Sequence, residues 1–261
     1  MNILSDCLSQ LTEHLRGDSS VKGLLITGSV AYGYSSPHSD MNIMIIVSDQ
    51  EFEDRFQSGS LHYDGAECKV GRSLQNIDGK YISMAYLEKV ARCGSEPARF
   101  AFLGAIVVFS DIPELRDVLN TITEYPMSLK QNNIHRFYAQ FEAWYGECKQ
   151  ALKRDDTYLL HQAVMNMALF GGRMVLAHNE MLYPGHKWMM RVLDSVREKP
   201  ERLREQIQSL MSEPRENAIE QFYRHITEFR NWGIGEMKWA DYVIRDSELH
   251  WMQGSLPVAE L

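Results

Sequence analysis

The sequence predicts an α+β protein in which a small sheet domain is followed by an all-α helical bundle. Short apolar runs in the first half, Leu24–Ile26 and Ile43–Val47, have the length and the flanking turn residues of buried strands. In the second half, apolar residues recur instead at the spacing of amphipathic helices. The break at Tyr125-Pro126 separates the two patterns, so we expect domains at 1–125 and 126–261.

Each element is predicted from its own periodicity. In chain order, the first domain is expected to contain a helix at 2–16, a strand at 21–27, a short helix at 31–34, a strand at 41–47, a helix at 49–56, strands at 67–70 and 77–83, a helix at 84–93, a last strand at 107–109 and a helix ending at 122. The second domain is expected to contain helices at 129–153, 156–179, 186–197, 200–211 and 215–231. The aromatic residues Phe137, Phe141 and Trp144 recur at helical spacing and are expected in the core of the bundle.

Composition and charge exclude several classes of protein. The chain has 261 residues, of which 44% are hydrophobic and 24% charged, as in an ordinary folded protein. A net charge of -8 argues against general nucleic-acid binding and leaves only a local basic strip open. The four cysteines form no Cys-x-x-Cys pair, which argues against a zinc site or a disulfide framework. Without a signal peptide or a long apolar run, a cytoplasmic protein with no membrane partner is expected.

The stretch between the first two predicted strands is the candidate functional site. It begins with Gly28-Ser29 and ends with Ser39-Asp40, at the start of the second strand. Glycine lets a backbone N–H approach a phosphate closely, and a serine hydroxyl adds a donor. An aspartate at the start of the next strand can hold a hard cation beside that phosphate. His38 is expected to mark the turn before it.

The pattern Gly28-Ser29, a short turn helix and Ser39-Asp40-x-Asn42 resembles the signature of the nucleotidyltransferase superfamily that includes DNA polymerase beta. The family pattern is Gly-Ser, a spacer, and then Asp-x-Asp or Asp-x-Glu. The resemblance implies a mixed-sheet nucleotidyltransferase domain that moves a nucleoside monophosphate from a triphosphate, by default ATP, to a hydroxyl. It also implies two Mg²⁺ ions. Positions 40 and 42 would serve as catalytic metal ligands on one face of a strand, and Gly28, Ser29 and Ser39 would hold the phosphates.

The chain departs from the family pattern at the second carboxylate position, which is Asn42. An amide carries no charge, and its NH₂ group cannot face a metal. Either the chain is an inactive relative, or an acid was changed to an amide in an active enzyme. Because the rest of the motif is intact, we favour the second interpretation.

The superfamily also needs a third carboxylate on a strand beside the first two. Asp78, in the predicted strand 77–83, is our choice as catalytic and metal-binding residue, and Glu67 is the alternative. For either acid, a solvated position at a strand end is the competing interpretation. Lys187 follows Pro-Gly in the second half and is a candidate to meet the triphosphate.

The two-part layout resembles small-molecule nucleotidyltransferases of the kanamycin and lincosamide type. Two stretches of the helical half, Ala151–Asp156 and Asn179–Trp188, contribute to this looser likeness. It implies an antibiotic or another hydroxyl-bearing small molecule as acceptor, and a role in antibiotic resistance. A protein or tRNA acceptor, a non-catalytic nucleotide-binding protein and a homodimer stay open. For tRNA, the candidate cations are Lys149, Lys153, Arg154, Arg173 and Lys187, which form no dense basic run.

Overall fold

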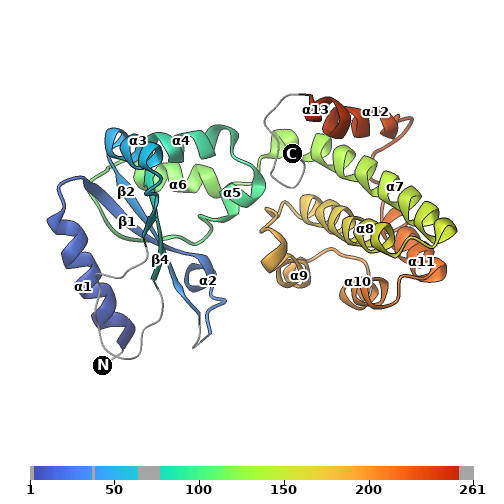
Figure 1. Cartoon of the computed structure of the whole chain (residues 1–261), viewed down its shortest axis with the longest axis horizontal. Helices are drawn as coiled ribbons and strands as arrows, with labels where there is room; N and C mark the ends of the chain where they lie inside the picture. The colour runs from blue at the N-terminus through green and yellow to red at the C-terminus, as the bar shows by residue number, and fades with distance from the viewer. Residues whose placement is uncertain (1–2, 37–38, 64–76, 253–261) are drawn as a thin grey trace. The chain divides into compact units, whose positions relative to one another are not determined.

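The structure is a computed structural model that describes residues 3–36, 39–63 and 77–252. The chain divides into two compact units, Met1–Glu124 and Tyr125–Leu261 (Figure 1). The first unit combines a five-stranded sheet with helices, and the second is helical among its described residues. The predicted α+β class with a sheet domain before a helical domain is therefore confirmed.

The sheet of the first unit is mixed, as the resemblance implied. Its strands lie in the order β3-β4-β2-β1-β5. Their bounds are β1 Val21–Thr27, β2 Met41–Val47, β3 His62–Tyr63, β4 Ile77–Ser83 and β5 Ile106–Ser110. Strands β2 and β4 are parallel, whereas the other neighbouring pairs are antiparallel. The expected strand at 67–70 lies outside the described residues.

Both faces of the sheet are covered by helices, which explains why β1 and β2 are continuous apolar runs. Successive residues point to opposite faces, so Leu24 belongs to one core cluster with Leu11 of α1 (Ile3–Gly17), whereas Leu25 belongs to the other. That second cluster includes Leu87 of α4 (Met84–Cys93) and Leu115 of α6 (Leu115–Thr123). Figure 1 shows α1 on one side of the sheet and α4 and α6 on the other. The helices are α1 Ile3–Gly17, α3 Asp49–Ser58, α4 Met84–Cys93, α5 Glu96–Phe100 and α6 Leu115–Thr123.

The short helix after β1 is displaced from its predicted position. We expected it at 31–34, but α2 spans Gly28–Ala31 and begins directly where β1 ends. The reason is the backbone of Gly28, whose φ of 67° turns the chain out of the strand at once. The Tyr32 N–H then donates to the Gly28 carbonyl at 3.0 Å, which closes the turn.

The second unit is built from helices. A short 3₁₀ segment, Met127–Leu129, leads into α7 Lys130–Arg154, α8 Thr157–His178, α9 His186–Ser195, α10 Leu203–Ser212, α11 Glu216–Thr227, α12 Trp239–Val243, a π-helical turn at Ile244–Glu248 and α13 Leu249–Trp251. Phe137 and Phe141 are buried as predicted, whereas Trp144 is only partly buried. The segments after residue 238 were not predicted. Among the helices that the structure describes, none has the length and hydropathy of a membrane span.

Candidate functional site

The Gly-Ser turn lies directly against the start of the second strand. Thr27, the last residue of β1, pairs with Asn42 of β2, and Gly28 follows it with a positive φ. A Cβ atom on Gly28 would lie only 2.9 Å from Nδ2 and 3.1 Å from Cβ of Asn42. Glycine is therefore required twice at this position, for the backbone conformation and for the close approach to the Asn42 side chain.

Strand β4 brings Asp78 beside Asn42. The two residues are register partners in the parallel pair of β2 and β4, so their side chains lie on the same face of the sheet. Their neighbours Met41 and Ile77 are also partners and are buried in the core on the opposite face. The structure thus joins position 42 and the preferred third carboxylate in one place. The alternative, Glu67, lies outside the described residues.

Asp40 and Ser39 lie immediately before β2. Asp40 is exposed and stands two residues before Asn42, the spacing that puts side chains on one face of an extended chain. The Ser39 hydroxyl accepts a hydrogen bond from the Ser36 N–H at 2.8 Å, and the Ser39 N–H donates to the Ser36 carbonyl at 3.0 Å. In this structure Ser39 therefore closes the turn that leads into Asp40. His38 lies outside the described residues.

A segment far away in sequence supports the back of the turn. Ser29 is buried, and the Tyr32 hydroxyl donates to the Phe100 carbonyl at 2.9 Å. Burial raises the pKa of Tyr32 to about 12. Gly104 packs so tightly against α2 that a Cβ atom there would lie 2.7 Å from the Ala31 carbonyl oxygen. Sequence patterns did not predict these contacts, because they depend on the tertiary packing of the segment from Phe100 to Gly104 against the Gly-Ser turn.

His62 is a second feature that sequence reasoning missed. It lies on the edge strand β3, whose register places it opposite Lys80 of β4. Its Nε2 atom lies 3.1 Å from Oδ1 of Asp78, and the side chains of His62 and Asp78 are 66% and 48% exposed. An ionised carboxylate only accepts hydrogen bonds, so the imidazole N–H is the donor. No spacing rule signals this pair, since the two residues meet only through strand pairing.

The donor set suits one hard divalent cation better than two. It consists of the carboxylates of Asp40 and Asp78 and the amide oxygen of Asn42. Mg²⁺ in nucleotide sites commonly uses one or two carboxylates together with water and substrate phosphates. Within residues 3–36, 39–63 and 77–252, no group of three or more His, Cys, Asp or Glu side chains could hold a metal. A cation held by Asp40 and Asp78 would therefore need further oxygen ligands, such as water and substrate phosphates.

Lys187, the remaining candidate residue, lies in the second unit. It is exposed near the start of α9, and its Nζ lies 5.3 Å from the ring centroid of Trp188. A cation over an aromatic face is held weakly at an exposed site. Its role toward a triphosphate stays a prediction.

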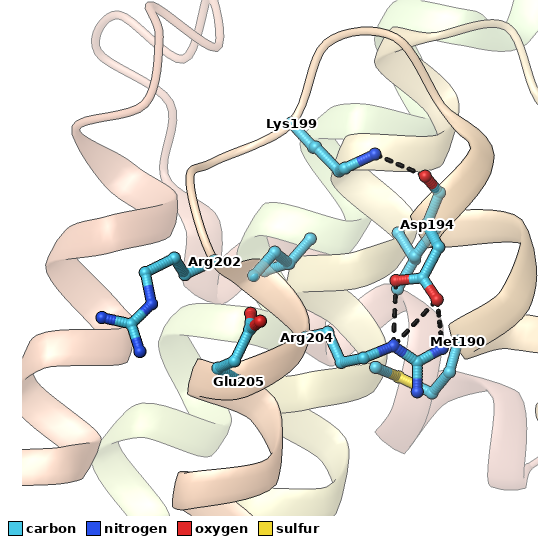
Figure 2. A pocket seen from close by; sticks show the side chains of 8 residues that line it. Met190, Asp194, Lys199, Arg202, Arg204 and Glu205 are labelled. Carbon is cyan, nitrogen blue, oxygen red and sulfur yellow. Dashed lines mark hydrogen bonds and ion pairs between the residues drawn. The ribbon is translucent and has the colours of Figure 1, made fainter.

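A cavity of about 260 Å³ lies within the second unit, between α9 and α10 (Figure 2). Arg204 donates through Nε to both carboxylate oxygens of Asp194, at 3.0 and 2.8 Å, and its Nη2 also contacts that group. Lys199 donates to the backbone carbonyls of Asp194 and Val196. Because these charged groups bond to one another and to the backbone, we assign no ligand to this cavity.

The comparisons with known proteins agree with the fold. A solved structure of a nucleotidyltransferase-like protein from Exiguobacterium sibiricum 255-15 matches 99% of this chain and 83% of its own chain. The TM-score is 0.50 and the sequence identity 11%, so the similarity concerns the fold. No protein-family model and no curated protein matches the sequence.

Proposed function

We propose that the chain binds a nucleoside triphosphate with a divalent cation and acts as a nucleotidyltransferase. The observation that carries the proposal is the meeting of three segments at one end of the sheet. Gly28 contacts Asn42, and Asn42 is the register partner of Asp78. The similarity in fold to a nucleotidyltransferase-like protein supports the same class.

In this proposal the side chains have separate tasks. The backbone at Gly28 and the hydroxyl of Ser29 bind phosphate oxygens, for which a close-packed glycine turn is suited. Asp40 and Asp78, with the amide oxygen of Asn42, hold Mg²⁺, which neutralises charge on the phosphates when it is bound. The transferred group is a nucleoside monophosphate, with ATP as the default donor. The second Mg²⁺ and the contribution of Ser39 remain predictions from the resemblance.

The acceptor in this proposal is a hydroxyl on a small molecule, such as an antibiotic of the aminoglycoside or lincosamide class. The acidic balance of the chain, with a net charge of -8, suits a cationic acceptor. A protein or a tRNA acceptor is the competing outcome. Incubation of each acceptor class with the four triphosphates, followed by mass spectrometry, distinguishes them by the product that gains a nucleoside monophosphate.

A second candidate function is nucleotide binding without transfer. Asn42 favours it, because the amide leaves the site one negative charge short of the family pattern. In that case a triphosphate binds with a cation, but no acceptor is modified. Restoration of transfer by Asn42→Asp would favour the transferase over the binding protein.

The proposal is tested by calorimetric titration of the chain with each triphosphate in the presence of Mg²⁺. Asp40→Asn is expected to weaken binding at least tenfold, because it removes a charged ligand of the cation. Asp54→Asn is the matched control, since Asp54 is an exposed acid on α3 in the same unit. Failure of the parent chain to bind any triphosphate, or equal losses in both variants, would overturn the proposal.

A further inference from the structure

The carboxylate of Asp78 is hydrogen-bonded to a residue outside the motif. His62 reaches it from β3, the edge strand next to β4, with Nε2 3.1 Å from Oδ1. On the other side of β4 lies β2, where Asn42 is the register partner of Asp78. The acid therefore lies between an amide on one side and an imidazole on the other.

A half-exposed aspartate without a fixed partner would occupy several rotamers. The conformational entropy lost when a cation fixes one rotamer would then oppose cation binding. A hydrogen bond to one oxygen removes this freedom and leaves the second oxygen as a ligand. Carboxylates that bind metals are typically hydrogen-bonded in this way, and loss of such an outer partner typically weakens metal binding about 10- to 100-fold. A fixed Asp78 carboxylate matters more in this site, because Asn42 contributes no negative charge to cation binding.

We infer that His62 is a positioning residue that holds Asp78 in the orientation that binds the divalent cation. The inference rests on the proposed function and assigns a role in it to a residue that the motif does not contain. His62 is placed by the pairing of β3 with β4 and contacts Asp78 through one ring nitrogen. Glutamine can supply an N–H donor at a similar reach, so His62→Gln should preserve the role.

The experiment measures Mn²⁺ binding to the full chain, with free Mn²⁺ counted by electron paramagnetic resonance. His62→Ala is expected to weaken binding about 10- to 100-fold, whereas His62→Gln should remain close to the parent chain. His161→Ala, which changes an exposed histidine on α8, is the matched control and should leave the affinity unchanged. Thermal unfolding of each variant should match the parent, because a half-exposed pair contributes little to stability.

Two different failures are distinguishable. If Asp40→Asn weakens Mn²⁺ binding but His62→Ala does not, the positioning role is refuted and the proposed function stands. If His62→Gln binds as weakly as His62→Ala, a hydrogen bond to Asp78 does not explain the effect of His62, and the positioning role is also refuted. If the parent chain binds no Mn²⁺, or Asp40→Asn changes nothing, the proposed function fails and this inference fails with it.

Discussion

Replacing Asn42 by aspartate should strengthen cation binding while weakening the cation-free fold. The two side chains have the same shape, so the carboxylate fits against Gly28 where the amide now lies. It adds a third negative charge next to Asp78, its register partner, and two residues from Asp40. The charge attracts a divalent cation and repels the two existing carboxylates, which produces opposite effects with and without metal.

The magnitude follows from the spacing of the sheet. At about 4 Å the new charge attracts a divalent cation by about 2 kcal/mol at the dielectric of water and about 8 kcal/mol at an effective dielectric of 20. Asp78 lies one strand spacing away, about 4.8 Å, and Asp40 about 6.7 Å along the strand, so their repulsion sums to about 1.5 to 6 kcal/mol over the same range. This repulsion is present with and without the cation, so it lowers the stability of the cation-free fold and does not subtract from the affinity. At the dielectric of water, the attraction of about 2 kcal/mol corresponds to about thirtyfold tighter cation binding.

The assay is urea unfolding in EDTA and in saturating Mg²⁺, together with cation affinity by calorimetry. In EDTA, Asn42→Asp should lower the free energy of unfolding by about 1 to 2 kcal/mol, because these partly exposed charges repel each other at an effective dielectric close to that of water. Mg²⁺ should recover the loss, because it binds only the folded chain. The control is Asn132→Asp, which adds the same charge on an exposed turn of α7. If Mg²⁺ restores neither stability nor affinity beyond this control, the cation site is wrongly assigned.

Three further predictions concern positions that the structure singles out. Gly28→Ala should destabilise the fold more than Gly33→Ala, because both glycines have positive φ but only a Cβ at position 28 would meet a neighbouring side chain. The backbone strain alone costs about 1–2 kcal/mol in either variant. Urea unfolding measures how much more unfolding free energy Gly28→Ala loses than Gly33→Ala. Arg99→Met should cost about 3 kcal/mol or more of unfolding free energy, because the buried guanidinium donates to four backbone carbonyls near the ends of α4 and α6. Cys148 should resist alkylation through pH 9 while exposed Cys93 reacts, because burial raises the pKa of the Cys148 thiol to about 12 and little thiolate forms below that pH.

Each of these predictions has a control and an opposing result. Asn42→Ala removes the amide group and keeps the Cβ, so it should relieve part of the excess cost of Gly28→Ala, and additive losses would contradict the proposed clash. Arg92→Met removes an exposed arginine from the last turn of α4 and should change stability by less than about 0.5 kcal/mol. Equal losses at both arginines would refute the role of the buried guanidinium. Peptide mass mapping that finds Cys148 alkylated at the rate of Cys93 in the native chain would show that its burial is transient.

The parts of the fold that were predictable are those in which burial produces a strong local pattern. Strands β1 and β2 were predicted to the residue, because both faces are covered and the apolar runs are continuous. The short helix was misplaced because its start depends on the φ of Gly28, a torsion that composition does not reveal. The edge strand β3 was missed, since two residues carry no measurable periodicity.

The chain's amino-acid order was sufficient to identify an α+β layout and the Gly-Ser and Asp-x-Asn positions, because strand burial and motif spacing are local properties. Strand pairing decided that Asp78 stands beside Asn42 and that His62 holds Asp78. It also decided that Gly28 contacts the Asn42 side chain. These contacts join segments separated by 14 to 36 positions along the chain, and no local pattern encodes which strands become neighbours.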